Sequence, residues 1–256
     1  RYGIDTISAG GAIGFAMEAY EKGLISKETT GGMDLDWGNG EALVEMIRQI
    51  GERRGLGKLL GEGVKRAAAE LGPEAETFAL HVKGLEPPAH DARGFFGNAV
   101  AFATSARGAC HLSSFVHAFQ RALAMPEFGY DSVADRFDPN SSPYLTMMGQ
   151  NLMGMFDALK ACKFLLFGTA RTPQLLEWLN QVTGWGIDQE EFLHIGERIF
   201  NLKRLYNLRC GATGADDTLP LRFRTEPRPD GGAAGKLPPF EAMLPEYYRI
   251  RGWDSQ

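Results

Sequence analysis

The sequence predicts a mainly α protein made of two helical lobes, with at most one short strand. Most of the chain divides into segments whose apolar residues recur at roughly three- and four-residue steps, which is the period of an amphipathic helix. Several of these segments begin after a side chain that can cap a helix or end at glycine. Only one short run has the composition of a strand.

Three helices are expected in the first lobe. The first covers residues 6–22 and ends at Gly23, a favoured residue for a helix C-terminus. The second starts at Asn39, whose side chain can accept a hydrogen bond from the first turn, and ends near Gly55. The third covers residues 59–71, where a glycine and a proline follow.

The strand candidate is residues 77–82, Thr-Phe-Ala-Leu-His-Val. It leads into residues 83–88, a stretch rich in glycine and proline that is typical of a boundary between lobes. We therefore expect a first lobe over residues 1–85 and a second over residues 86–256.

The second lobe is expected to be helical as well. An irregular stretch covers residues 126–143, and a long loop rich in glycine and proline covers residues 224–239. The segments with helical patterns are 97–105, a stretch of undefined limits after His111, 144–166, 172–183, 188–208 and 241–250.

Composition excludes several classes of protein. A net charge of −5 argues against nucleic-acid binding, and the apolar runs are far too short to cross a membrane. The 3 cysteines show no CxxC spacing and suit a reducing compartment, the cytoplasm. The 32 glycines among 256 residues exceed the usual share of about 7% and indicate tight turns and close approaches of the backbone.

Four residues are candidates for chemistry when the sequence is considered alone. His111 follows a cysteine and could act as a base, a proton donor or a ligand, although a hydrogen-bonded core histidine is the commoner case. His90 is equally ambiguous, whereas His117 and two other histidines fit structural roles. Asp157 and Cys162 would point to different sides of a continuous helix and could converge only if the helix ends between them.

The order of short motifs along the chain resembles the tungsten-containing aldehyde:ferredoxin oxidoreductase family. The match spans nearly the whole chain and corresponds to the two C-terminal helical domains of that family. The motifs are Gly3-Ile4-Asp5-Thr6-Ile7-Ser8, residues 15–21, residues 82–87, Arg107-Gly108-Ala109-Cys110-His111, residues 196–202, Asp216-Asp217-Thr218-Leu219-Pro220 and residues 246–254.

This resemblance implies a tungsten (or molybdenum) ion held by two pterins beside a [4Fe–4S] cluster. Two Asp-x-x-Gly-Leu-(Asp/Cys) segments hold the pterins in the family. The first would end at Asp5 and the second would run from Asp157 to Cys162, with Lys160 and Ala161 in place of glycine and leucine. A carboxylate suits this task because it can accept hydrogen bonds from the amino-pyrimidine edge of a pterin.

The resemblance also implies roles for the thiol of Cys162 and the imidazole of His111. Cys162 would be one of the four cluster ligands, and His111 would lie close to the metal and the substrate, where its protonated form could donate a hydrogen bond to a carbonyl oxygen. The implied reaction is oxidation of a small aldehyde to a carboxylic acid, with electrons passed to ferredoxin or to an electron-transfer subunit.

Two other functions are open at this stage. One is the tungsten subunit of an aromatic acyl-CoA ring reductase, and the other is a helical scaffold or interaction module without cofactor. The chain starts inside a structured segment, so we expect it to be a fragment that lacks an N-terminal domain. Such a fragment is expected to retain no cofactor, to be inactive alone and to self-associate as a homo-oligomer.

Overall fold

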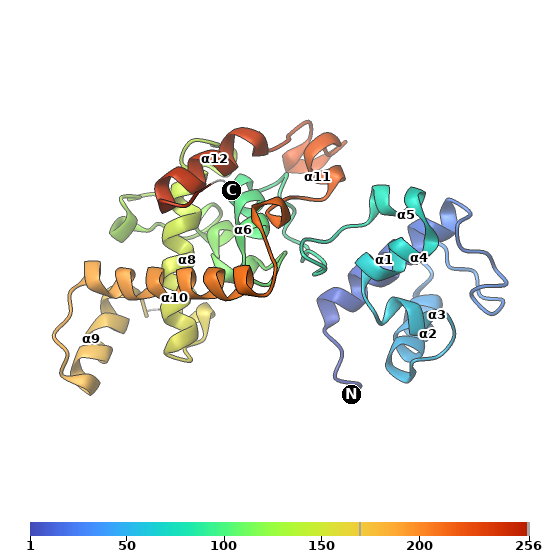
Figure 1. Ribbon diagram of the computed structural model, residues 1–256, viewed down its shortest axis with the longest axis horizontal. Coiled ribbons are helices and arrows are strands. Elements are labelled where there is room, and N and C mark those ends of the chain that lie inside the picture. The colour runs from blue at the N-terminus through green and yellow to red at the C-terminus, as the bar shows by residue number, and fades with distance from the viewer. Residues whose placement is uncertain (169, 255–256) are drawn as a thin grey trace. The chain divides into compact units, whose positions relative to one another are not determined.

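The computed structural model describes residues 1–168 and 170–254, and its secondary structure is helical (Figure 1). Over these residues strand-like pairing is limited to isolated bridges, such as Val82 with Leu85. The predicted mainly α fold is therefore confirmed. The elements are α1 Thr6–Glu21, α2 Gly40–Glu52, α3 Gly55–Leu60, α4 Val64–Leu71, α5 Pro73–Phe78, α6 Phe96–Thr104, η1 His111–Ser113, α7 Val116–Phe119, η2 Pro126–Phe128, α8 Ser142–Ala158, η3 Lys163–Phe167, α9 Thr172–Thr183, α10 Gln189–Arg209, η4 Gly214–Asp216, α11 Leu221–Thr225, η5 Gly231–Ala233 and α12 Phe240–Arg251.

The chain forms two compact units. Unit 1 comprises Arg1–Ala89 together with the short segments Arg107–Ala109 and Thr218–Glu226. Unit 2 comprises His90–Ala106, Cys110–Asp217 and Pro227–Gln256. Two segments from later in the chain thus complete the first unit, so neither unit is a single continuous stretch of sequence.

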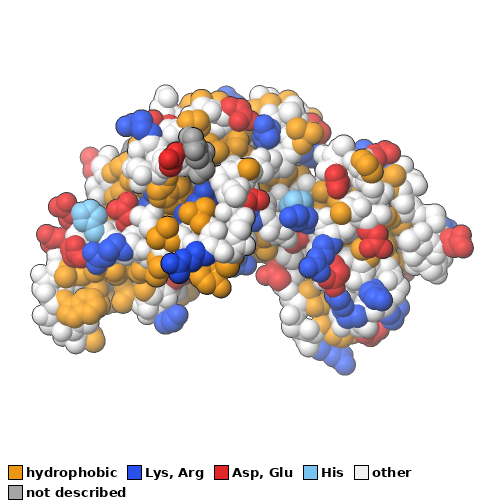
Figure 2. All heavy atoms as spheres, viewed as in Figure 1, with side chains coloured by type: hydrophobic (Ala, Val, Ile, Leu, Met, Phe, Trp, Pro, Cys, Tyr) orange, Lys and Arg blue, Asp and Glu red, His pale blue; other side chains and the backbone are white. Residues whose placement is uncertain are grey.

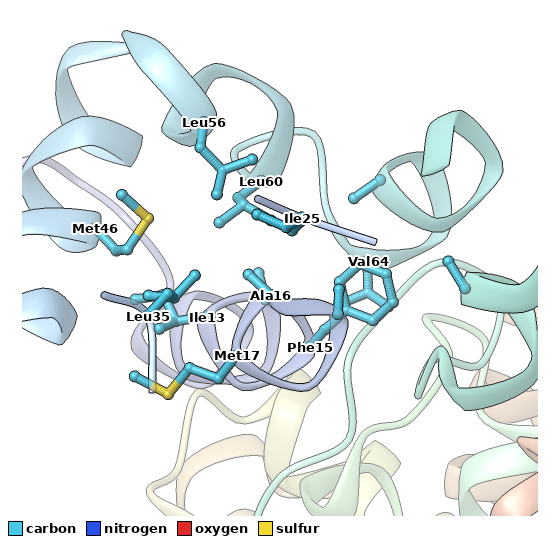
Figure 3. Packing of buried hydrophobic residues seen from close by; sticks show 14 of the residues in the cluster. Ile13, Phe15, Ala16, Met17, Ile25, Leu35, Met46, Leu56, Leu60 and Val64 are labelled. Carbon is cyan, nitrogen blue, oxygen red and sulfur yellow. The ribbon is translucent and has the colours of Figure 1, made fainter. Parts of the chain in front are cut away.

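The core of unit 1 is built around α1. Ile13, Ala16 and Met17 of this helix lie among apolar side chains of α2, α3 and the connecting loops (Figure 3). Asp5 caps the helix by accepting a hydrogen bond from the backbone N–H of Ser8 at 2.8 Å, as an N-cap side chain should. Asn39 caps α2 in the same way, at 3.1 Å from the N–H of Ala42, which confirms the predicted start of that helix.

Two expectations for unit 1 are wrong. The single helix over residues 59–71 is two helices, because the chain breaks at Gly61–Gly63, where Gly63 has a φ of +89° that a helix cannot contain. The strand over residues 77–82 is absent, because α5 occupies its first two residues. Pro73 at the first helical position and acidic residues in the first turn favour that helix.

Helices α8 and α10 cross in unit 2 at a pair of glycines (Figure 1). A Cβ on Gly196 would lie 2.0 Å from the carbonyl oxygen of Asn151, and one on Gly154 would lie 3.0 Å from that of Gly196. The backbones can approach this closely only because neither residue has a side chain.

The buried Arg251 of α12 ties that helix to α8. Its guanidinium donates to the Oδ1 of Asn151 at 2.6 Å, to the Oε1 of Gln150 at 2.8 Å and to the hydroxyl of Tyr247 at 3.0 Å. It also lies over the ring of Phe200, 4.5 Å from its centroid. These contacts satisfy a buried charge, which would otherwise be costly.

Large hydrophobic side chains gather on one face of unit 2, over α9 and α10 (Figure 2). Monomeric proteins seldom expose many large apolar side chains together. We therefore still predict that the chain self-associates or contacts a further domain, and this face is suited to that contact. The exposed large apolar residues of α9 and α10 are Trp178, Val182, Leu202, Leu205, Tyr206 and Leu208.

Candidate cofactor and catalytic site

The segment from Asp157 to Cys162 leaves the end of α8 through a tight turn. The helix that the sequence predicted over residues 144–166 stops at Ala158, and Cys162 is the N-cap of η3. Lys160, which stands where the family has glycine, has a φ of +57° in the left-handed region. The condition under which Asp157 and Cys162 could converge, a helix that ends between them, is thus met.

We expect Lys160→Gly to raise the free energy of unfolding by about 0.5–1 kcal/mol. The left-handed conformation costs a residue with a Cβ roughly 1–2 kcal/mol, and glycine offsets part of this gain through its larger conformational entropy in the unfolded chain. Lys58→Gly is the matched control, because Lys58 lies inside α3. That substitution should lower stability by about 1 kcal/mol. Denaturant unfolding measures both, and a loss of stability in Lys160→Gly would contradict the prediction.

Two lysines hold the carboxylate of Asp157. The ammonium of Lys163 lies 2.9 Å from Oδ1, and that of Lys203 on α10 lies 3.1 Å from Oδ2. Partial burial acts to raise the pKa of Asp157, but the hydrogen bonds and charges of the two lysines outweigh it and hold the pKa below its ordinary value. Asp157 is therefore ionised near neutral pH and keeps lone pairs for a further donor.

Lys163 also connects this segment to the loop that carries His111. Its ammonium donates to the carbonyl oxygen of Leu112 at 2.7 Å, while it pairs with Asp157. The residue after Cys162 and the residue after His111 are therefore in direct contact. Within unit 2, Lys163 therefore links the segment that carries Asp157 and Cys162 to the segment that carries His111.

Three imidazoles from three segments lie in contact in unit 2, and the rings of His90 and His117 are stacked. The ring centroids are 4.9 Å apart for His90 and His111, 4.2 Å for His90 and His117, and 5.3 Å for His111 and His117. His117 is buried, and its Nδ1 has no hydrogen-bond partner. Burial first, and then the charges of the other two histidines and of Arg121, lower the pKa of His117 to about 3.

The histidine cluster does not have the geometry of a metal site. Over residues 1–168 and 170–254, no group of three or more His, Cys, Asp or Glu side chains is placed to hold a metal ion. In the same part of the chain, no helix has the length and apolar character needed to cross a bilayer.

Asp5 lines a pocket of about 470 Å³ in unit 1. The backbone turns into it at Gly3, with a φ of +69°, so this segment repeats the left-handed turn seen at Lys160. Arg53, Gly63 and Gly84 are among the other residues that line this pocket. The carboxylate of Asp5 accepts one hydrogen bond, from the backbone N–H of Ser8. It can accept further hydrogen bonds from a ligand.

The donor groups of these segments fit the cofactors that the resemblance implies. Asp5 and Asp157 each offer an ionisable carboxylate next to a left-handed turn. Cys162 is an exposed free thiol, which as a thiolate could supply one corner of an iron–sulfur cluster. Cys110 is buried and Cys210 lies at the end of α10, away from either segment in sequence.

The family follows from comparison with known proteins. The profile of the family described as aldehyde ferredoxin oxidoreductase, domains 2 and 3, matches residues 1–256. The chain therefore belongs to the aldehyde ferredoxin oxidoreductase family and corresponds to its second and third domains, which confirms the resemblance seen in the motifs.

Curated relatives are considerably longer than this chain. It is 40% identical over 256 residues to a tungsten-containing aldehyde ferredoxin oxidoreductase of Pyrococcus furiosus, covering 98% of this chain and 40% of that protein. The corresponding protein of Thermococcus kodakarensis is 39% identical over 258 residues, covering 99% of this chain and 41% of the relative. The chain is also 31% identical to the WOR-like subunit of an aliphatic sulfonate oxidoreductase of Pyrococcus furiosus, covering 99% of this chain and 38% of that subunit.

A solved structure shares the fold. The active-site complex BamBC of benzoyl coenzyme A reductase, in complex with 1,5-dienoyl-CoA, superposes with a TM-score of 0.72 at 19% identity. The match covers 99% of this chain and 42% of that one. At this identity the likeness supports the fold alone.

The side-chain contacts of the candidate residues were not predicted from the sequence. Nothing in the spacing of His90, His111 and His117 indicates that their rings lie in contact, because they come from three separate segments. Likewise, no helical spacing links Lys203 to Asp157, which lie on different helices. Only the crossing of α8 and α10 places them together.

Proposed function

We propose that this chain is the C-terminal part of a tungstopterin iron–sulfur oxidoreductase that oxidises an aldehyde to a carboxylic acid and passes the electrons to ferredoxin. The family match over the whole chain, at 40% identity to a curated tungsten enzyme, carries the proposal. The left-handed turns at Gly3 and Lys160 support it, because each places a carboxylate beside a turn of the kind that the family's pterin segments require.

Three residues of this chain would bind the cofactors. Asp5 and Asp157 would accept hydrogen bonds from the two pterins, and Cys162 would supply one thiolate to the cluster. The bound cofactors would supply the two-electron oxidation of an aldehyde and a water molecule to an acid, with the electrons leaving one at a time through the cluster. The remaining cluster ligands would come from the part of the protein that the longer relatives contain and this chain does not.

His111 would hold the aldehyde. An imidazole N–H can donate a hydrogen bond to the carbonyl oxygen, which orients the substrate and stabilises the negative charge that develops on that oxygen. The contact between Leu112 and Lys163 keeps this loop beside the segment that carries Cys162.

Replacing His111 tests the proposal. In the full-length protein, His111→Ala should lower kcat for a small aldehyde about 100-fold, because loss of a general acid or a charge-stabilising donor costs that order of rate. Tungsten and iron contents should stay normal. His194→Ala, at an exposed histidine of α10, is the control and should leave kcat unchanged. Unchanged turnover in His111→Ala with normal tungsten would reject the role.

A substrate panel separates this function from its alternatives. Turnover of aldehydes with a low-potential electron acceptor supports the proposal. Reduction of an aromatic acyl-CoA by a low-potential donor would favour the ring-reductase function instead. A full-length protein without iron–sulfur absorption in the visible range would indicate the scaffold function.

A further inference from the structure

Glu86 is a buried acidic residue that lines the pocket at Asp5 in unit 1. Only 3% of the residue is exposed. One oxygen of its carboxylate, Oε1, accepts a hydrogen bond from the backbone N–H of Val64 at 2.7 Å. Val64 is the first residue of α4, so this bond satisfies one of the N–H groups that the start of a helix leaves unpaired.

The protein satisfies the carboxylate of Glu86 only in part. Among residues 1–168 and 170–254, Val64 supplies the hydrogen bond of this carboxylate, and no cationic side chain forms an ion pair with it. The guanidinium of Arg53, which lines the same pocket, is paired with Glu62 instead. Burial of a carboxylate is costly unless donors or a cation satisfy it. A ligand that donates a hydrogen bond in this pocket would therefore stabilise the buried group.

Two glycines make room for the side chain of Glu86. A Cβ on Gly11 of α1 would lie 3.0 Å from the Cβ of Glu86, and one on Gly63 would lie 3.1 Å from its Oε1. Gly63 also has a φ of +89°, which a residue with a Cβ rarely adopts. The carbon chain of Glu86 thus packs against α1, while its carboxylate lies at the first residue of α4.

The pocket therefore has a carboxylate at the N-terminus of each of two helices. Asp5 caps α1, and Glu86 binds the first N–H of α4. The N-terminal end of a helix favours negative charge, so both groups suit the role of hydrogen-bond acceptor. Each keeps lone pairs beyond its bond to the helix. A ligand in this pocket would meet acceptors from two separate segments of the chain.

The size and the donor set of the pocket favour an organic ligand over a metal ion. Its volume of about 470 Å³ is typical of a small-molecule site. In the part of the chain that the structure describes, no group of three or more His, Cys, Asp or Glu side chains is placed to hold a metal ion. Two carboxylates suit a heterocycle with several N–H donors along one edge. The amino-pyrimidine edge of a pterin has this pattern.

We propose that Glu86 is a further pterin-binding residue, whose second carboxylate oxygen accepts a hydrogen bond from the pterin that Asp5 also binds. The inference rests on the proposed function, because that function supplies the pterin. It goes beyond the resemblance, which assigns the pterins to the segment that ends at Asp5 and to the segment from Asp157 to Cys162. Glu86 lies in neither segment.

The tungsten and pterin contents of the full-length protein test this role. In Glu86→Gln the amide oxygen can still accept the bond from Val64, but an NH₂ group replaces the second carboxylate oxygen. We expect both contents to fall about tenfold, because two opposed donors replace a charge-assisted hydrogen bond. Glu74→Gln, at an exposed residue in the first turn of α5, should leave both contents at the wild-type level. Tungsten is measured by elemental analysis, and pterin by the fluorescence of its oxidised form after release.

The outcomes separate this inference from the proposed function. Wild-type contents of tungsten and pterin in Glu86→Gln overturn the inference and leave the proposed function standing. A wild-type full-length protein that contains no pterin overturns both.

Denaturant unfolding of the cofactor-free protein, produced in cells that make no pterin, separates pterin binding from helix capping. Glu86→Gln should unfold there at the wild-type denaturant concentration, because the bond to Val64 is kept. If that variant is less stable or fails to fold, Gly11→Ala decides, since its methyl would press on Glu86. Gly10→Ala is the matched control, because a Cβ on Gly10 would meet nothing within 4 Å. The tungsten content should fall in Gly11→Ala alone, and equal contents in the two alanine variants overturn the inference.

Discussion

The Gly196→Ala protein should unfold at a markedly lower denaturant concentration than the wild type, with a free energy of unfolding reduced by roughly 3 kcal/mol. The added methyl would lie 2.0 Å from the carbonyl oxygen of Asn151, far inside contact distance. That oxygen belongs to the backbone of α8, so no side-chain rotation can relieve the clash. The two helices must separate, and the buried side chains between them lose their packing.

Gly10→Ala is the matched control for this substitution. Gly10 lies inside α1, and a Cβ there would meet nothing within 4 Å. Alanine is favoured over glycine within a helix, so this variant should gain about 0.5–1 kcal/mol. Equal stability of the Gly196→Ala protein and the wild type would show that α8 and α10 do not cross as closely as described.

The protein should lose stability between pH 6.5 and pH 4.5 because of His117. Its folded-state pKa of about 3 lies below the value near 6.5 expected for the unfolded chain. In this window the unfolded chain binds a proton that the folded protein rejects. The stabilisation is therefore complete above pH 6.5 and falls by about 1.4 kcal/mol for each unit below it. Urea unfolding at pH 7.0 and pH 4.5 measures the difference.

The variant His117→Phe isolates this effect. A phenyl ring keeps an aromatic side chain against Phe95 and Phe115 but cannot take up a proton in the unfolded state. The decrease in the free energy of unfolding between pH 6.5 and pH 4.5 should therefore be smaller by roughly 2–3 kcal/mol in this variant than in the wild type. His194→Phe, at an exposed position, should leave the loss as it is in the wild type. Identical pH dependence in His117→Phe and the wild type would refute this explanation.

Local signals predicted much of the fold because they act within a few residues. Asn39 caps α2 as expected, and α9 covers the predicted residues 172–183. The wrong predictions arose where two local signals competed. At residues 59–71 the apolar pattern continued through Gly61–Gly63, and at residues 77–82 the strand-like composition overlapped a helix that starts at Pro73.

The candidate site was predictable only in part, for the same reason. The sequence shows Lys160 where the resemblance implies glycine, and the structure shows why this matters, because its φ of +57° is a conformation that is costly for a residue with a Cβ. The contact of His90 and His117 with His111 was not predictable, because ring contacts between separate segments depend on how those segments pack.

By itself, the sequence determined the helical class, the family and the identity of the candidate ligands, since periodicity, capping and motif order are properties of the chain. Tertiary structure alone decided which charges meet Asp157, how closely α8 and α10 approach, and which imidazoles lie in contact. These depend on distances between residues far apart in the chain, and electrostatic and steric energies change steeply over a few ångströms.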